Sequence, residues 1–281
     1  MTILYDDLPV VYGTGEVLKD SKTNWVDFKL KSIAVSKCFD ETDKYWLGRS
    51  QRMLDCGSVL TFAVAANGDK RLMHARFCRD RMCPACQKRR SLMMFHQVKD
   101  VCQAQQKEMP GTRYLLLTLT VPNVEAENLK DKLKQMSKGF YRMFQRAEVR
   151  KAVRGWFRAL EVTCNLERGD YHPHYHVLLA VSSKYFKGKH YIKQARWLEL
   201  WQESMRAFSI TQIDVRTVKP NPKRVGSTDI ESAAAEVGKY ATKPKDYLVK
   251  TPSGEYLAHS PVVKVLAQCL RNVRLVGLAA L

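Results

Sequence analysis

Two periods of hydrophobic positions alternate along the middle of the chain, and together they predict an α+β fold. Apolar, β-branched segments that stop at turn residues predict four strands, at 114–121, 157–164, 174–181 and 210–218. Apolar residues that recur every three or four positions predict amphipathic helices over 126–154, 191–208 and 228–243. The first six of these elements follow the order of the split β-α-β-β-α-β, or ferredoxin-like, plan.

The same pattern divides the chain into four segments. Residues 1–37 show no clean period, and we expect them to form a loosely ordered N-terminal arm. Residues 38–110 are rich in cysteine and end in a basic helical pattern over 88–107, which Pro110-Gly111 terminates. Residues 111–250 hold the regular strands and helices and are expected to be the main domain. Residues 251–281 form a C-terminal tail that the pattern does not place.

The charge of the chain points to a polyanionic partner. Among 281 residues there are 47 Lys and Arg against 28 Asp and Glu, a formal net charge of +19, while 45% hydrophobic residues exclude a disordered chain. No apolar stretch approaches the roughly 18 residues of a membrane span. The acidic N-terminus lacks a secretory signal, so we expect a cytoplasmic protein without a disulfide framework. Nucleic acid is the expected partner; the alternative is a solvated basic surface without a specific ligand.

Three histidines at the start of a predicted strand form a candidate metal site. Alternate residues of a strand face the same side, so His174 and His176 can present two imidazoles to one ion. His172 shares that face if the chain is already extended before Pro173. Glu161, near the middle of the preceding strand, is the candidate carboxylate ligand, because a buried carboxylate needs a partner. The alternatives are surface histidines on a loop edge and a solvated glutamate; the cluster does not name the metal.

The last predicted helix carries a candidate nucleophile. Glu236 and Tyr240 are four residues apart and would lie on one helical face. A tyrosine hydroxyl acts as a nucleophile once its proton is removed, and the nearby Lys239 and Lys243 can hold a phosphate. The alternative is an ordinary core or interface tyrosine.

Four cysteines have the spacing of a structural zinc site. Cys78, Cys83 and Cys86 are compact, Cys56 lies upstream, and Cys38 and His74 are reserves for the fourth position. The alternative is four buried free thiols. Arginines near the cluster and along the helix after it can contact DNA, namely Arg79, Arg81, Arg89 and Arg90.

A basic stripe runs along the predicted helix 126–154, where Lys or Arg recurs every four residues. It includes Arg142 and Arg146, and part of it could follow a phosphate backbone. The alternative is a solvated face opposite the apolar one. Charge reversal at both arginines is expected to weaken DNA binding and its salt dependence if the stripe contacts DNA.

Taken together, these residues resemble the plasmid rolling-circle replication initiators, a branch of the HUH (His–hydrophobic–His) endonucleases. The branch most similar is the one of small bacterial plasmids, with one catalytic tyrosine and a nearby glutamate. The resemblance covers roughly residues 50–250. Its motifs are Thr118-Leu119-Thr120-Val121-Pro122-Asn123, Glu161-Val162-Thr163, His172-Pro173-His174-Tyr175-His176-Val177-Leu178-Leu179, Glu236-x-x-Lys239-Tyr240-x-x-Lys243, and Cys56-Gly57 with Cys78-Arg79-Asp80-Arg81-Met82-Cys83-Pro84-Ala85-Cys86.

The resemblance implies a fold and a set of roles. The fold would be a five-stranded antiparallel sheet with helices, preceded by a zinc-binding element. His174, His176 and Glu161 would hold Mg²⁺ or Mn²⁺ against the scissile phosphate. Tyr240 would nick single-stranded DNA at the plasmid origin and keep the 5′ end as a phosphotyrosine. Glu236 would activate water for the terminating cleavage. The released 3′-OH would serve a host polymerase, with a host helicase as a further partner.

Two other functions remain open from the sequence. A transposase or relaxase of a mobile element would use the same His-x-His and Tyr chemistry. A zinc-containing DNA-binding regulator would have no nuclease activity, and its histidines would be incidental.

Overall fold

The chain folds into two compact units, neither of which is a continuous segment. The computed structural model describes residues 24–39, 43–64, 66, 70–219, 228–238 and 241–280. One unit combines Met1–Arg89 with Pro244–Gln268, and the other combines Arg90–Lys243 with Cys269–Leu281. These divisions differ from the four segments expected from the sequence. The expected tail 251–281 is shared between the units, and part of it completes the sheet of the second.

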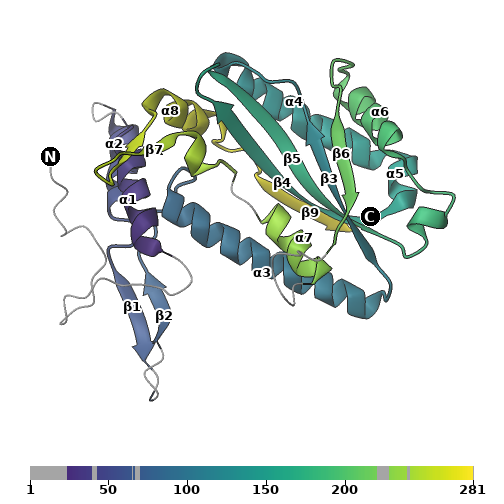
Figure 1. Ribbon diagram of the computed structural model, residues 1–281, viewed down its shortest axis with the longest axis horizontal. Coiled ribbons are helices and arrows are strands. Elements are labelled where there is room, and N and C mark those ends of the chain that lie inside the picture. The colour runs from purple at the N-terminus through teal and green to yellow at the C-terminus, as the bar shows by residue number, and fades with distance from the viewer. Residues whose placement is uncertain are drawn as a thin grey trace. The chain divides into compact units, whose positions relative to one another are not determined.

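The first unit is the smaller of the two and contains both helices and strands. Its elements are α1 (Trp25–Ser36), α2 (Lys44–Leu54), the antiparallel pair β1 (Leu60–Val64) and β2 (Lys70–Ala75), the first turns of α3 (Pro84–Glu108), the 3₁₀ turn η3 (Pro244–Asp246), the antiparallel pair β7 (Leu248–Lys250) and β8 (Tyr256–Ala258), and most of α8 (Ser260–Cys269). Figure 1 shows these elements along the chain.

Helix α1 lies inside the segment that was expected to be a loosely ordered arm, so that expectation is wrong for residues 25–36. The Asn24 side chain accepts a hydrogen bond from the Asp27 backbone N–H and caps the helix. The buried side of α1 includes Lys29, Ser32 and Ser36 as well as apolar residues. Polar side chains on the buried face hide the hydrophobic period by which a helix is recognised.

The second unit is built on a five-stranded antiparallel sheet. Its strands are β3 (Arg113–Thr120), β4 (Val153–Asn165), β5 (Asp170–Val181), β6 (Ile213–Thr217) and β9 (Val276–Ala280). Their order across the sheet is β6-β3-β5-β4-β9, and every neighbouring pair is antiparallel. The four predicted strands are therefore confirmed, and so is the α+β class with a central antiparallel sheet. The fifth strand comes from the tail, whose short VGLAA sequence has no polar alternation.

The helices of this unit are shorter than the pattern predicts. The predicted helix 126–154 is interrupted and ends two residues early, because α4 (Ala126–Gln145) stops at Arg146, whose backbone is extended. A short helix α5 (Ala147–Ala152) follows, and β4 begins at Val153. The predicted helix 191–208 is α6 (Gln194–Met205), preceded by a 3₁₀ turn η2 (Tyr185–Lys187).

The predicted helix 228–243 also ends early. Helix α7 (Asp229–Val237) begins with a capping box made by Thr228 and Glu231. It ends at Gly238, whose N–H bonds to the Ala234 carbonyl. After two positions outside the described residues, the chain pairs with β4 instead: the Val162 N–H donates to the Ala241 carbonyl at 2.9 Å. Because the backbone of this segment forms its hydrogen bonds with β4, the segment does not continue the helix.

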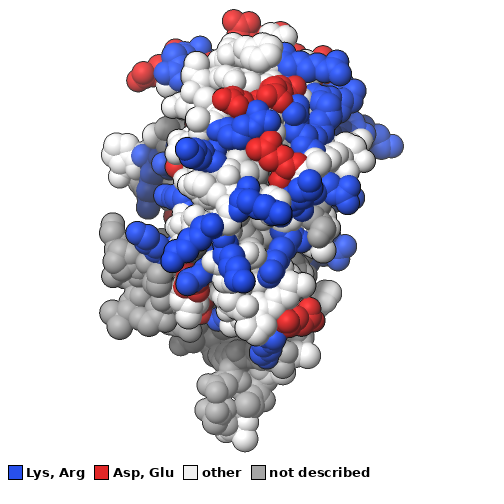
Figure 2. Space-filling model, turned by 90° about the vertical axis from the view of Figure 1, so that its right-hand side faces the viewer, with Lys and Arg blue, Asp and Glu red and all other residues white. Residues whose placement is uncertain are grey.

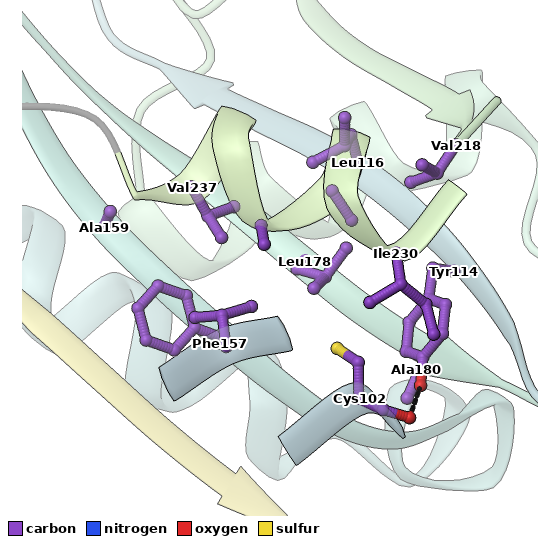
Figure 3. Packing of buried hydrophobic residues seen from close by; sticks show 13 residues of the cluster. Cys102, Tyr114, Leu116, Phe157, Ala159, Leu178, Ala180, Val218, Ile230 and Val237 are labelled. Atoms are coloured by element: carbon purple, nitrogen blue, oxygen red, sulfur yellow. Dashed lines mark hydrogen bonds between the residues drawn. The ribbon is translucent and has the colours of Figure 1, made fainter. Parts of the chain in front are cut away.

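One face of the sheet is covered by α7 and by the part of α3 that belongs to this unit. Leu116, Phe157 and Leu178 point from three neighbouring strands into a core with Ile230, Ala233, Ala234 and Val237 of α7 (Figure 3). Val98 and Cys102 of α3 complete the cluster, and the Tyr114 hydroxyl donates to the Cys102 carbonyl at 3.0 Å. This apolar packing fixes α7 on the sheet.

The opposite face carries α4 and α6. The ring of Phe140 on α4 packs against Tyr175 of β5 and Trp156 of β4, with centroids 5.5 and 4.9 Å apart. Trp201 of α6 is buried, and its indole N–H donates to the Thr120 carbonyl at the end of β3. Within the described residues, no helix is long and apolar enough to cross a membrane.

Candidate functional site

Two histidines and a glutamate converge on the face of the sheet that α7 covers. Glu161 on β4 lies directly opposite His174 on β5, and His176 follows two residues later on the same side. This register brings Glu161 beside the two histidines, on the same face of the sheet. The Glu161 Oε2 atom is 2.8 Å from His176 Nε2 and 3.3 Å from His174 Nε2, and the two Nε2 atoms are 3.2 Å apart.

This trio has the geometry of a metal site. Its three ligand atoms all lie within 4.8 Å of one another, and Glu161 is only 1% exposed. Two imidazole nitrogens and a carboxylate oxygen turned toward one point form the kind of donor set that binds divalent ions. The His174 Nδ1 atom is 3.2 Å from the His172 carbonyl, which fixes the ring so that Nε2 faces Glu161 and His176.

The carboxylate at the centre of the trio is charged. Burial alone raises the pKa of Glu161, but hydrogen bonds from His174, His176 and Lys243 outweigh it and hold the pKa far below its usual range. The Lys243 ammonium forms an ion pair with Glu161 Oε1. A carboxylate that stays ionised in a buried position is ready to bind a cation.

His172 lies beside the trio without being part of it. Its ring stacks on that of His174, with centroids 5.2 Å apart. Burial and the neighbouring His174 lower the pKa of His172. Its backbone carbonyl is the group that faces His174 Nδ1, so this residue orients a neighbour through its main chain.

The segment of the candidate nucleophile adjoins this trio. Lys239 and Tyr240 lie outside the described residues. The residues that follow them are bonded to β4: Thr242 forms an isolated bridge with Val162, the neighbour of Glu161, and Lys243 pairs with Glu161 itself. On the other side, Glu236 of α7 is half-buried, with Arg216 Nη2 of β6 3.5 Å from its Oε1 atom.

The four cysteines chosen from their spacing come together in the first unit. Cys86 Sγ is 3.5 Å from the Sγ atoms of both Cys56 and Cys78, and Cys83 Sγ is 3.7 Å from that of Cys56. Zinc–sulfur bonds of about 2.3 Å in a tetrahedron separate the sulfurs by about 3.8 Å, close to these distances. The reserve ligand Cys38 is bonded to the Ala34 and Ala258 carbonyls instead.

A buried ion pair holds the loop between the cysteines. The Arg49 guanidinium makes two 2.8 Å hydrogen bonds to the Asp80 carboxylate, and that carboxylate also accepts from the Met82 N–H. The guanidinium lies over the rings of Phe39 and Trp46 at 4.7 and 5.1 Å. These contacts fix Cys78 and Cys83 on either side of Asp80.

Comparisons with known proteins decide the family. A family model described as "Replication protein" matches residues 69–281, which include the histidines, the nucleophile segment and three of the four cysteines. The chain belongs to the replication protein family.

Individual members of the family cover most of this chain. "Protein rep" of Streptococcus pneumoniae is 37% identical over 223 residues, 79% of this chain and 68% of that protein. "Protein rep" of Lactiplantibacillus plantarum is 34% identical over 273 residues, 95% of this chain and 83% of that protein. No solved structure matches. The resemblance to plasmid replication initiators that the motifs suggested is thus confirmed.

In this replication protein family member, the arginines chosen as DNA contacts have different surroundings. Arg79 and Arg89 are exposed, and Arg89 lies over the Phe77 ring at 4.9 Å; Arg81 and Arg90 are half-buried. Arg142 Nε donates to the Ser204 carbonyl of α6 at 2.7 Å, and Arg146 Nη1 pairs with Glu203 at 2.6 Å. Arg142 and Arg146 therefore connect α4 to α6, a role that the charge stripe did not reveal.

Sequence reasoning missed two charged residues of the site, Asp214 and Arg216, and gave Lys243 a different partner from the one it has. Lys243, chosen for phosphate, is the partner of Glu161. Asp214 of β6 lies opposite Thr118, which in turn lies opposite His176, so it belongs to the same row of the sheet face. Arg216 pairs with both Asp214 and Glu236. The signal was present in the predicted strand 210–218, where these two charges alternate.

Proposed function

We propose that this plasmid replication initiator nicks single-stranded DNA at the origin with a metal-dependent HUH-type centre and Tyr240 as the nucleophile. The observation that carries the proposal is the convergence of Glu161, His174 and His176 on one sheet face, beside the segment that contains Tyr240. The donor set fits Mg²⁺ or Mn²⁺. When bound there, the ion would polarise the scissile phosphate and hold it in place.

The protein's own groups would do the rest of the chemistry. Tyr240 directly precedes Ala241, whose carbonyl accepts a hydrogen bond from the N–H of Val162, the neighbour of Glu161, and this sequence position supports Tyr240 as the nucleophile. As the tyrosine loses its proton and its oxygen bonds to phosphorus, the bond to the 3′ oxygen breaks. The departing 3′ oxygen takes up a proton. The products are a 5′-phosphotyrosine and a free 3′-OH from which a host polymerase can extend.

Positive groups near the trio would balance the charge of the phosphate. Lys243 already neutralises Glu161, and Lys239 adjoins Tyr240 in the sequence. In the reverse step, a 3′-OH attacks the phosphotyrosine and rejoins the strand. For termination, Glu236 would take a proton from a water molecule, and that water would hydrolyse the phosphodiester bond of the second cleavage. The ion pair with Arg216 would orient the Glu236 carboxylate for this role.

The four cysteines would hold a structural Zn²⁺. The separations of their sulfur atoms support this, and so does the burial of Cys56, Cys83 and Cys86 at 5% exposure or less. Buried thiolates at such short range repel one another unless a cation lies between them. The exposed Arg79 and Arg89 on this element are the proposed contacts to origin DNA.

One assay tests the nicking proposal. The protein is incubated with a labelled origin hairpin and Mn²⁺, and a nicked product covalently attached to the protein is expected. Tyr240→Phe should abolish the adduct, whereas Tyr141→Phe, at an exposed tyrosine of α4, should not change it. The Glu236→Ala variant should still make the first nick but should not carry out the second, terminating cleavage. An adduct that survives Tyr240→Phe removes Tyr240 from this role.

The same assay separates the other two functions. Absence of nicking in the presence of Mn²⁺ would favour the zinc-containing DNA-binding regulator. Nicking of a transposon end or a transfer origin, with no cleavage of a replication origin, would favour a transposase or relaxase.

A further inference from the structure

One segment of the second unit combines positive charge with exposed aromatic rings, and the proposed chemistry does not use it. The loop 182–193 joins β5 to α6 and reads SSKYFKGKHYIK. It contains Lys184, Lys187, Lys189 and Lys193, all exposed, and no acidic residue. We refer to it as the lysine–aromatic loop.

The lysine–aromatic loop has a defined structure. The buried Tyr185 anchors it: its hydroxyl is 3.3 Å from both the N–H and the carbonyl of Ile192. The η2 turn starts with a hydrogen bond from the Tyr185 N–H to the Ser182 carbonyl. The rings of Phe186 and Tyr191 pack against Tyr185, with centroids 5.2 and 5.3 Å away. The loop therefore presents its side chains from a fixed backbone.

Phe186 and Tyr191 have large aromatic side chains, yet nearly half of the surface of each is exposed to solvent. They are 44% and 46% exposed, and their centroids are 6.1 Å apart. An exposed aromatic ring among lysines suits a nucleic-acid base, since bases stack on such rings while ammonium groups contact the phosphates. Duplex DNA hides its base faces, so this combination favours a single strand.

More positive charge surrounds the loop at the same end of the sheet. Val181, which directly precedes it, lies opposite both Val153 of β4 and Arg113 of β3. Arg154, next to Val153, is exposed, as are Arg150 and Lys151 of α5. Figure 2 views the molecule from the right-hand side of Figure 1, where α5 and α6 lie, and shows more Lys and Arg than Asp and Glu side chains on that surface.

This end of the sheet is remote from the candidate metal site. His174 and Val181 are seven residues apart on β5, which at about 3.3 Å per residue separates them by about 23 Å. A strand that reaches from the trio to the loop therefore extends several nucleotides from the nick.

We propose that the lysine–aromatic loop is a second binding site for single-stranded DNA, which holds the strand away from the nick by stacking bases on Phe186 and Tyr191. The proposal rests on the proposed function only in taking DNA as the ligand. It predicts that oligonucleotides long enough to reach the loop bind more tightly than short ones centred on the nick site.

Binding of a fluorescent oligo-dT and of an abasic strand of equal length tests the proposal by anisotropy. Phe186→Leu with Tyr191→Leu should weaken binding of oligo-dT about fivefold or more and leave binding of the abasic strand unchanged. Tyr141→Leu, an equally apolar change at an exposed tyrosine of α4, is the matched control and should have no effect. Circular dichroism melts verify that each variant is folded.

The lysines are tested by the salt dependence of binding. Replacing Lys184, Lys187 and Lys189 by Ala should lower the slope of log K against log salt by about two, because each phosphate contact in a single strand contributes about 0.7. Replacing Lys37, Lys44 and Arg52, which are exposed on the first unit, removes the same charge and should change the slope less.

Three results would overturn the inference: unchanged binding of oligo-dT by the leucine variant, an equal loss on the abasic strand, or lysine effects seen only with duplex DNA. Because these measurements need no cleavage, they are independent of the nicking assay. If the leucine variant loses oligo-dT binding but the wild-type protein does not nick, the second binding site is supported and only the proposed function is contradicted.

Discussion

At the scale of single residues, the site depends on one carboxylate in an apolar strand. Glu161 has Leu160 and Val162 as buried neighbours, and the strand keeps it because two histidines and a lysine surround it. A buried charge without partners would be strongly destabilising. The geometry therefore explains why a glutamate at this position is compatible with folding, and the same geometry supports its proposed role as a metal ligand.

Replacing Glu161 by Gln keeps the size of the side chain and removes its charge. We expect the affinity for Mn²⁺ to fall by at least about tenfold, since even the groups that only orient ligands contribute that much. Isothermal titration calorimetry with Mn²⁺ measures it. Glu167→Gln, at an exposed glutamate in the β4–β5 turn, is the control and should bind as the wild type does. Equal affinities for all three proteins would exclude Glu161 as a ligand.

At the scale of elements, the break between α4 and α5 shows how tertiary contacts redirect a helical pattern. The sequence continues its apolar and basic periods through Arg146, but the backbone there is extended and the side chain pairs with Glu203. Arg142 is held by the carbonyl at Ser204 in the last turn of α6. Positive side chains at the C-terminal end of a helix also interact favourably with its dipole.

Arg142→Gln should therefore lower the free energy of unfolding by about 1–2 kcal/mol, because it removes charge-assisted hydrogen bonds to a partly buried carbonyl. Urea denaturation followed by circular dichroism measures the change. Lys138→Gln, an exposed position of the same helix, should change it by less than about 0.5 kcal/mol. If both variants are equally stable, the contact with α6 contributes nothing, and the DNA-binding interpretation of Arg142 gains support.

At the scale of the whole molecule, two candidate metal sites lie in separate units of one chain. The cysteine cluster belongs to the unit that contains Met1–Arg89, and the His–Glu trio belongs to the sheet of the other. A metal ion bound by the cysteine cluster would add to the stability of the first unit, because metal binding and folding are coupled. The net charge of +19 is uneven: the unit with the cysteine cluster has 18 Lys and Arg against 13 Asp and Glu (+5), and the unit with the trio has 29 against 15 (+14).

Cys83→Ser tests the zinc site without touching the trio. We expect purified wild-type protein to contain about one zinc per chain, and the variant to contain little and to melt at a lower temperature, because metal binding and folding of small units are coupled. Elemental analysis and thermal denaturation measure both effects. Cys164→Ser, a half-buried cysteine at the end of β4, is the control. Full zinc content in Cys83→Ser would contradict the assignment of this ligand.

The sequence by itself determined the class of the fold and the chemistry of its residues. Strand and helix periods follow from which side chains are apolar, so four strands and their connecting helices were predictable, and the alternation of His174 and His176 was enough to put both on one face. Cysteine spacing was enough to select four thiols that converge. Each of these inferences uses contacts between residues close in the chain or repeated at a fixed period.

Only the tertiary structure decided which distant residues meet. The register of β4 on β5 set Glu161 opposite His174, the tail supplied the fifth strand β9, and the segment after Gly238 left its helix to pair beside Glu161. It also turned Arg142, Arg146 and Lys243 from free charges into partners of other groups. Such contacts depend on the backbone and charged groups brought near by folding, and no local period in the sequence encodes them.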